Sequence, residues 1–290
     1  MTAPKREYPF ATAAEAAAQA AAAPPSPQTT SPSFRLAFDD PEFLRRDEMR
    51  AMRLALEVSK PDILLGEAGI DSTVVLFGSA RVASPEMAAA LSAGPGTEAG
   101  QAAAARASEQ LRWYEEARRF AYRLTKASRK LGRRDFAIVT GGGPGIMEAG
   151  NRGAAEAGGQ TIGLSIVLPH EQAPNRWVTP SLSFQFHYFG IRKMQFLMRA
   201  RAAAFFPGGF GTLDELFETL TLLQTGKIRR IPLLLFDRAW WTRLIRFEAL
   251  VADGMIAPED LDLITWVETA EEGVEAIGRF YGLALSDSPR

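Results

Sequence analysis

A glycine-rich stretch, Pro207–Glu215, contains the residues in this chain that are best suited to chemistry. It follows an apolar run and precedes a helical pattern, so it predicts a strand, a tight loop and a helix start. Glycines let backbone N–H groups approach a ligand closely, and a helix start supplies unpaired donors and a partial positive charge. We therefore expect the loop to bind a phosphate through Gly208, Gly209, Gly211 and Thr212.

Glu215 admits two interpretations from the sequence. If Thr212 is the N-cap of the following helix, Glu215 stands three residues later, where the glutamate of a capping box would stand. In the second interpretation, Glu215 is a carboxylate held over a phosphate-bearing ligand. The loop by itself leaves both open.

Two adjacent cations, Arg192 and Lys193, stand near the start of a predicted helix over residues 188–198. The helix dipole disfavours cations at that end, because it favours acidic groups in the first turn. A local conflict of this kind is typical of a functional site, and a solvated basic pair is the alternative interpretation.

Two earlier strand-to-loop junctions also carry small residues. Thr73–Phe77 predicts a buried strand that leads into residues 78–81, and residues 136–139 predict a strand that leads into the loop Thr140–Gly145. Open α/β sheets bind ligands beyond the carboxyl ends of their strands, so both loops are candidates for ligand contact. The second loop lacks the glycine spacing of the dinucleotide fingerprint, no stretch matches the Walker pattern, and simple tight turns remain the alternative.

Strands alternate with helices from Thr73 onward, which predicts one Rossmann-like, doubly wound α/β domain with a mostly parallel sheet and helices on both faces. We expect this domain over residues 73–290, with a mobile insertion at residues 82–105. Residues 1–33 predict a disordered tail, and residues 34–72 an N-terminal helical extension.

An aromatic-rich helix is predicted over residues 240–251. Trp240 and Trp241 on this helix, and Trp266 on a later strand, are expected in the core rather than on a base-stacking platform.

The composition excludes several classes of function. A chain of 290 residues that is 47% hydrophobic can bury a full core. The absence of cysteine excludes disulfides, thiolate catalysis and cysteine-ligated metal centres, and two histidines do not predict a metal site. The net charge of −1 and the lack of a long apolar run predict neither a nucleic-acid nor a membrane partner. We expect a cytoplasmic protein.

Blocks of this sequence resemble the signature motifs of the LOG ("lonely guy") family of phosphoribohydrolases, long mislabelled as lysine decarboxylases. The matching blocks are residues 77–81 (Phe-Gly-Ser-Ala-Arg), 140–148 (Thr-Gly-Gly-Gly-Pro-Gly-Ile-Met-Glu), 190–194 (Gly-Ile-Arg-Lys-Met) and 207–215 (Pro-Gly-Gly-Phe-Gly-Thr-Leu-Asp-Glu). Arg192 and Glu215 are 23 positions apart, a spacing similar to that of the family's catalytic arginine and glutamate. The resemblance covers residues 73–266. The N-terminal extension and the insertion resemble longer bacterial forms.

The resemblance implies hydrolysis of the N-glycosidic bond of a nucleoside 5′-monophosphate, AMP or a cytokinin riboside 5′-monophosphate, to a free base and ribose 5-phosphate. Positive charge develops at the ribose C1′ as this bond breaks, so a fixed carboxylate there stabilises the transition state more than the ground state. We expect Glu215 to fill this role and to orient the attacking water, and Arg192 to position Glu215 or the substrate. Sugar and base contacts are expected from Ser79, Arg81, Gly142, Gly143, Met147 and Lys193.

This mechanism needs no metal or redox cofactor, and the resemblance implies a homo-oligomer, either a dimer or an assembly of dimers. One alternative is a non-catalytic nucleotide or molybdenum-cofactor carrier on the same fold, against which the intact Arg192 and Glu215 argue. Another is an interaction protein whose loops are only turns and whose N-terminal tail docks. A decarboxylase is not supported, because no lysine stands in a recognisable cofactor-anchoring context.

Overall fold

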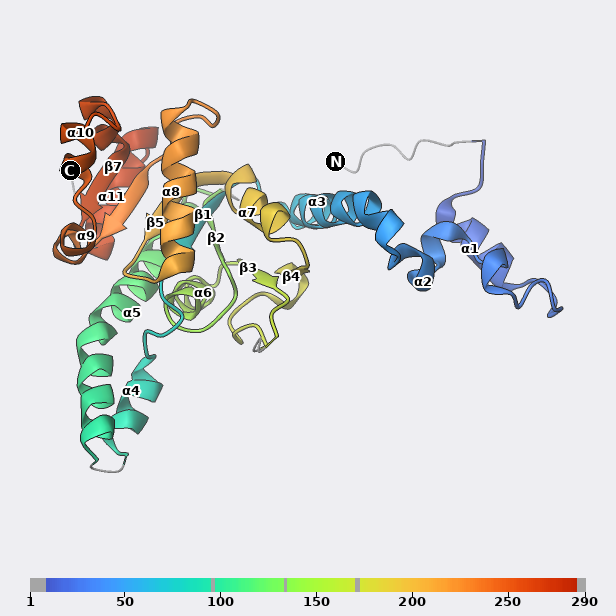
Figure 1. Ribbon diagram of the computed structural model, residues 1–290, viewed down its shortest axis with the longest axis horizontal. Coiled ribbons are helices and arrows are strands. Elements are labelled where there is room, and N and C mark those ends of the chain that lie inside the picture. The colour runs from blue at the N-terminus through green and yellow to red at the C-terminus, as the bar shows by residue number, and fades with distance from the viewer. Residues whose placement is uncertain (1–8, 95–96, 133–134, 170–172, 286–290) are drawn as a thin grey trace. The chain divides into compact units, whose positions relative to one another are not determined.

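The structure is a computed structural model, which describes residues 9–94, 97–132, 135–169 and 173–285 (Figure 1). The chain divides into two compact units, Met1–Glu57 and Val58–Arg290. No helix in the described part of the chain is both long and apolar enough to cross a lipid bilayer.

The first unit is helical. Its elements are α1 (Ala13–Ala21), η1 (Pro32–Phe34), η2 (Ala37–Asp39), α2 (Pro41–Leu44), η3 (Asp47–Met49) and the beginning of α3 (Arg50–Glu67). Helix α1 lies where the sequence predicts a disordered tail. It begins with a capping box in which the Thr12 hydroxyl accepts from the Glu15 N–H at 3.2 Å and the Glu15 carboxylate accepts from the Thr12 N–H at 2.7 Å. Alanine has the highest helix propensity, so this cap and an alanine run form a helix of nine residues, none of them buried.

The second unit is built on one parallel sheet of seven strands, in the order β4-β3-β2-β1-β5-β6-β7. The strands are β1 (Thr73–Phe77), β2 (Ala137–Thr140), β3 (Thr161–Ile166), β4 (Ser183–Phe186), β5 (Ala200–Phe205), β6 (Leu233–Phe236) and β7 (Ile264–Val267). The helices are α4 (Pro85–Ser92), α5 (Glu98–Lys130), α6 (Ile146–Glu156), α7 (Phe189–Met198), α8 (Phe210–Gln224), α9 (Arg238–Leu244), α10 (Phe247–Ala252) and α11 (Ala270–Tyr281), with short turns η4 (Pro180–Leu182) and η5 (Pro258–Leu263). The predicted doubly wound α/β fold is confirmed.

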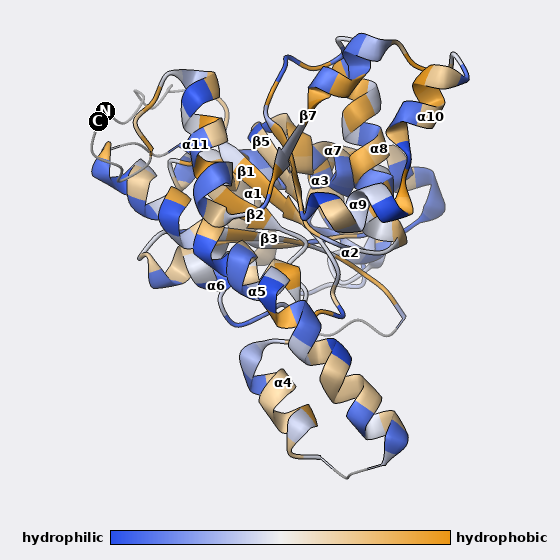
Figure 2. Cartoon of the chain, turned by 90° about the vertical axis from the view of Figure 1, so that its left-hand side faces the viewer, coloured by the Kyte–Doolittle hydropathy of each residue, from blue (hydrophilic) through white to orange (hydrophobic). Residues whose placement is uncertain are grey.

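Helices cover both faces of the sheet because alternate strand residues point to opposite sides. On one face, Val74 and Leu76 of β1 belong to a buried cluster with residues of α5, α6 and α11. On the other face, Val75 and Phe77 belong to a cluster with residues of α7, α8, α9 and α10 and with Leu65 of α3. Figure 2 shows the central strands mostly in the colour of hydrophobic residues and the outer helices with hydrophilic stretches.

The strand order creates a topological switch point between β1 and β5. The chain moves from β1 outward through β2, β3 and β4, and then returns to the other side of β1 with β5. The loops that follow β1 and β5 therefore run to opposite faces of the sheet and leave a crevice beyond the carboxyl ends of these two strands. The two predicted ligand loops after residues 77 and 206 meet there.

Within residues 82–105, predicted as a mobile insertion, the structure describes residues 82–94 and 97–105, which contain helix α4 and the first part of the 33-residue helix α5. Ser84 and Thr97 cap these helices, their hydroxyls accepting from Met87 N–H and Gly100 N–H, each at 3.2 Å. The segment is helical because the alanines that make it low in sequence complexity are also strong helix formers. The predicted helix over residues 240–251 is instead two helices, α9 and α10, because the backbone at Ile245 between them is extended.

Helix α6 lies so close to α5 that Gly153 has no room for a side chain. A Cβ atom there would lie 2.0 Å from the carbonyl oxygen of Arg118. We expect Gly153→Ala to lower the free energy of unfolding by about 2 kcal/mol or more, because the two backbones must move apart. Urea denaturation measures this. The matched control is Gly66→Ala in α3, where a Cβ atom meets nothing within 4 Å, and an unchanged or higher stability is expected. Equal effects at both positions would contradict the tight helix contact.

Candidate active site

A cavity of about 670 Å³ opens at the switch point of the sheet. Its walls include residues 76–81 at the end of β1, residues 208–215 after β5, and side chains from α6, α7 and α9. Nine of the residues predicted for the site line it: Ser79, Arg81, Met147, Arg192, Gly208, Gly209, Gly211, Thr212 and Glu215. Residues from four separate parts of the sequence therefore share one cavity.

Gly142, Gly143 and Lys193 lie outside this lining. Gly142 has a positive φ of 75°, and its carbonyl and that of Gly143 accept from the Asn175 side-chain amide at 3.0 and 2.9 Å. These two glycines thus shape the loop after β2. Lys193 contacts two carboxylates of α8, at 3.0 Å for Asp214 and 2.8 Å for Glu218. Of these partners, Asp214 itself lines the cavity, so Lys193 stands directly behind the cavity wall, and the sugar and base contacts predicted for the three residues stay predictions.

The glycine-rich loop leads directly into α8, whose N-cap is Gly209. Thr212 is the third helical residue rather than the N-cap, so Glu215 lies within the second turn and forms no capping box. Position 208 requires glycine, because a Cβ atom there would lie 2.1 Å from the Thr212 hydroxyl oxygen. In the described part of the chain no side chain caps this helix, which leaves its first N–H groups to an anionic ligand.

The Glu215 carboxylate is buried, and one of its oxygens has no hydrogen-bond partner in the described part of the chain. The residue is 7% exposed, and among the described residues nothing donates a hydrogen bond to its Oε2 atom. Burial raises the pKa of Glu215 to about 7. The positive charges of Lys193 and Arg192 lower this pKa, and the negative charges of Glu218 and Asp214 raise it further. A carboxyl group with this pKa changes its charge near neutral pH, which is the range in which a general base or acid works best.

Arg192 reaches the same cavity from the first turn of α7. Its Nε atom donates to the carbonyl oxygen of Leu164 at 2.6 Å, and its guanidinium carbon lies 5.0 Å from the centre of the Phe196 ring. The guanidinium in this position lies close to the backbone of Gly141: a Cβ atom there would lie 2.6 Å from Nη2 of Arg192 and 2.8 Å from Sδ of Met147, so these side chains would have to shift. The carbonyl, the ring and the glycine together hold the guanidinium in one position.

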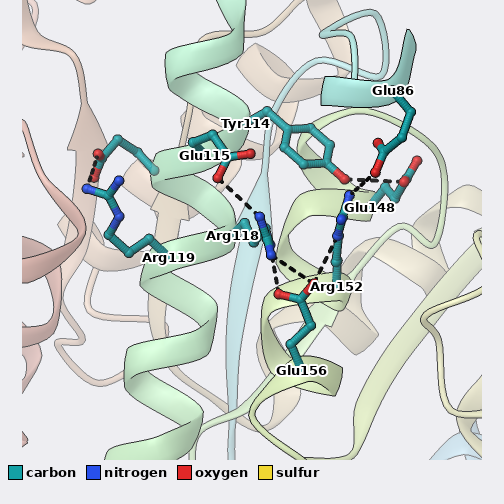
Figure 3. Close-up of polar contacts among 9 residues, drawn as sticks. Glu86, Tyr114, Glu115, Arg118, Arg119, Glu148, Arg152 and Glu156 are labelled. Carbon is teal, nitrogen blue, oxygen red and sulfur yellow. Dashed lines mark hydrogen bonds and ion pairs between the residues drawn. The ribbon is translucent and has the colours of Figure 1, made fainter. Parts of the chain in front are cut away.

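Helix α6, which carries Met147 into the cavity, is held by polar contacts to α5 (Figure 3). The Tyr114 hydroxyl donates to Glu148 at 3.2 Å, and burial raises the pKa of Tyr114 to about 12. Arg118 binds Glu156 through two hydrogen bonds of 2.7 and 3.0 Å. These contacts fix the helix that follows the loop at Gly141.

The cavity has an apolar wall that the sequence did not predict. Trp240 and Leu244 of α9 line it, whereas only Trp241 lies in the core, with 0% of its surface exposed. Trp240 is partly buried and packs against the core cluster that contains Trp241, so it contacts the core and the cavity at once. Adjacent residues of a helix point in different directions, so only one of these two neighbouring tryptophans is fully enclosed by the core.

The fold and the site together define a Rossmann-like α/β protein with a cavity at the switch point, lined by a glycine-rich helix start, a buried carboxylate and a guanidinium. Residues 147–277 match the family whose model is described as "Possible lysine decarboxylase". The chain is 27% identical over 151 residues to the cytokinin riboside 5′-monophosphate phosphoribohydrolase LOG3 of Arabidopsis thaliana. The aligned region covers 51% of this chain and 69% of that protein. LOG7 of the same plant is 26% identical over 151 residues, with coverages of 51% and 68%. These matches confirm the resemblance to the LOG family.

Solved structures also resemble this chain. The molybdenum cofactor carrier protein of Chlamydomonas reinhardtii is 15% identical, with a TM-score of 0.42 and coverage of 73% of this chain and 99% of that one. The molybdenum cofactor binding protein of Rippkaea orientalis is 20% identical, with a TM-score of 0.40 and coverages of 57% and 88%.

Proposed function

We propose that this protein hydrolyses the N-glycosidic bond of a nucleoside 5′-monophosphate, AMP or a cytokinin riboside 5′-monophosphate, to a free base and ribose 5-phosphate. The observation that carries the proposal is Glu215, a buried carboxylate whose Oε2 atom has no hydrogen-bond partner among the described residues. It lies on the wall of a cavity that also contains a helix start without a side-chain cap. Burying such a group costs folding free energy, which is typical of a residue kept for chemistry. The named relatives are phosphoribohydrolases.

The spacing within α8 suits a ribose 5-phosphate. Backbone N–H groups at Gly209–Gly211 and the Thr212 hydroxyl would bind the phosphate. Glu215 follows Gly211 by four residues, so it lies on the same side of the helix about 6 Å further along its axis. The sugar would bridge this interval and bring its C1′ atom to the carboxylate.

In the proposed reaction the bond between C1′ and the base nitrogen breaks, and its electron pair leaves with the base. Water attacks C1′ and transfers a proton to the Glu215 carboxylate, which also stabilises the positive charge at C1′. The departing base takes up a proton from solvent water, and Glu215 afterwards releases its proton to solvent. Arg192 keeps its charge at neutral pH and so donates no proton; its fixed guanidinium offsets negative charge on the base.

We expect kcat/KM for AMP to rise about tenfold between pH 6 and pH 8, because Glu215 must be ionised and its pKa is about 7. Glu218→Gln distinguishes this group from the substrate phosphate. The negative charge of Glu218 helps to raise the pKa of Glu215, so its removal should move the profile to lower pH. A profile that is flat, or that does not move in Glu218→Gln, would contradict the assignment to Glu215.

Gly141→Ala is expected to lower kcat/KM by about 10-fold to 100-fold, because the added methyl group displaces the Arg192 guanidinium from its position. Steady-state kinetics with AMP measures this, and the melting temperature shows whether the fold is intact. The matched control is Gly190→Ala in α7, the helix of Arg192, where a Cβ atom meets nothing within 4 Å. Full activity in Gly141→Ala would show that the position of Arg192 does not matter.

The function itself is tested by incubating the purified protein with AMP and quantifying adenine and ribose 5-phosphate by chromatography. Release of both products in equal amounts supports the proposal. Stable binding of AMP or of isopentenyladenosine monophosphate without release favours the nucleotide-carrier alternative. No binding of either nucleotide favours an interaction protein.

A further inference from the structure

Asp237, at the start of α9, has a backbone conformation that is rare for its residue type. Its φ is 68° and its ψ is 77°, in the left-handed region, and the residue is 9% exposed. Non-glycine residues adopt this conformation at a cost and keep it only where the surroundings impose it. A strained and buried aspartate therefore calls for a reason in what it holds in place.

The Asp237 carboxylate joins α9 to α5. Its Oδ1 atom accepts from the Trp240 N–H at 3.0 Å and so caps α9. Its Oδ2 atom accepts from Arg112 Nη2 at 2.7 Å and from the indole N–H of Trp113 at 2.8 Å. These three hydrogen bonds to one charged group fix the start and the direction of α9.

The fixed helix directs two side chains into the cavity. Trp240 and Leu244 are four residues apart, which places them on one side of α9, and both line the cavity. Trp113 and Trp241 meet the Trp240 ring at 75° and 86°, with ring centres 6.3 and 4.8 Å apart. Both contacts are edge-type rather than face to face, so the two rings hold the indole in place while Trp240 still lines the cavity.

We propose that Trp240 is the stacking platform for the nucleobase and that Leu244 favours purines with an apolar substituent on the exocyclic amine, with Asp237 as the positioning residue. This inference rests on the proposed function. Each part of the cavity wall suits one part of a nucleotide. The start of α8 would bind the phosphate, Glu215 would lie at the sugar, and the aromatic and aliphatic wall on α9 would contact the base. A planar base stacks on an indole, and an alkyl group one helical turn further along meets Leu244.

The decisive experiment compares ligands with and without a base. Calorimetric binding to the Glu215→Gln protein, which should not turn AMP over, is measured for AMP, N6-isopentenyl-AMP and ribose 5-phosphate. In this background, the second substitution Trp240→Ala should weaken AMP binding about 10-fold to 100-fold and change the affinity for ribose 5-phosphate by no more than about twofold. Trp240→Phe should retain most of the affinity for AMP. Leu244→Ala should lower the preference for N6-isopentenyl-AMP over AMP by about fivefold to tenfold.

Asp237→Asn tests the positioning role. Asparagine tolerates the left-handed conformation and can still cap the helix, but it lacks the charge that binds Arg112. We expect KM for AMP to rise with kcat little changed, and ribose 5-phosphate affinity to stay the same. Parallel loss of kcat and of ribose 5-phosphate affinity would indicate a general structural defect and overturn the positioning role.

The outcomes separate this inference from the proposed function. If Trp240→Ala weakens AMP and ribose 5-phosphate equally, or neither, the platform is wrong even where hydrolysis is observed. If the wild-type protein releases no adenine but base-dependent binding is lost in Trp240→Ala, hydrolysis is wrong and the platform stands. Absence of nucleotide binding overturns both.

Discussion

Replacing Glu215 by glutamine is expected to lower kcat for AMP hydrolysis by about 10³-fold or more, while the protein still folds and binds AMP. Glutamine keeps the shape of the side chain but carries no negative charge. It therefore neither stabilises positive charge at C1′ nor accepts the proton of the attacking water. Single-turnover kinetics measures the loss separately from product release, and calorimetry measures the remaining affinity for AMP.

Glu218→Gln is the matched control for this prediction. Glu218 lies one turn further along α8, contacts Lys193 at 2.8 Å and is not in the described cavity lining. Activity at pH 8 should persist in this variant, because Glu215 is ionised there in both proteins. Comparable losses in the two variants would assign the effect to the charge of α8 as a whole and would remove Glu215 from the reaction. Retained activity in Glu215→Gln would do the same.

The same substitution is expected to stabilise the protein at alkaline pH. Burial raises the pKa of Glu215 from 4.5 to about 7, so folding disfavours its ionised form. The group thus contributes stability that is fully present below pH 4.5 and is lost as the pH rises through 7. At about 1.4 kcal/mol per pKa unit, the loss is roughly 3 kcal/mol, and Glu215→Gln avoids it.

Urea denaturation of both proteins at pH 4 and pH 8 measures this effect. The stability of Glu215→Gln relative to wild type should rise by roughly 3 kcal/mol between the two pH values. The difference between pH values removes the constant cost of placing an amide at this position. Glu218→Gln should show a smaller gain, because it lowers the pKa of Glu215 only in part and leaves the carboxylate buried. A pH-independent difference for Glu215→Gln would mean that its carboxyl group is not destabilised by burial. If Glu215→Gln both loses hydrolysis and gains stability at pH 8, then Glu215 lowers the stability of the protein and is retained for its activity.

The alternation of strands and helices, and the edge of the sheet where the ligand loops meet, followed from the sequence. Apolar runs such as Thr73–Phe77 mark buried parallel strands, and glycine-rich loops directly after them mark strand ends. Both are local signals, because a strand buried on both faces must be apolar and a tight loop needs glycine. The resemblance of four short blocks to the LOG family rests on the same local residues.

Tertiary packing decided the features that carry the chemistry. Whether Glu215 caps the helix or serves as a carboxylate in the ligand site depends on where α8 begins and on what surrounds the side chain. The helix begins at Phe210, which excludes the cap. Lys193 stands next to Arg192 in the sequence, yet it contacts α8 instead of lining the cavity. Trp240, expected in the core, packs partly against it and also lines the ligand cavity, on a helix whose start Asp237 caps. The sequence by itself thus determined the fold and the location of the site, because these depend on local patterns of polarity and on glycine. The burial, charge state and direction of each side chain depend on neighbours far away in the sequence, and only the three-dimensional structure brings those neighbours together.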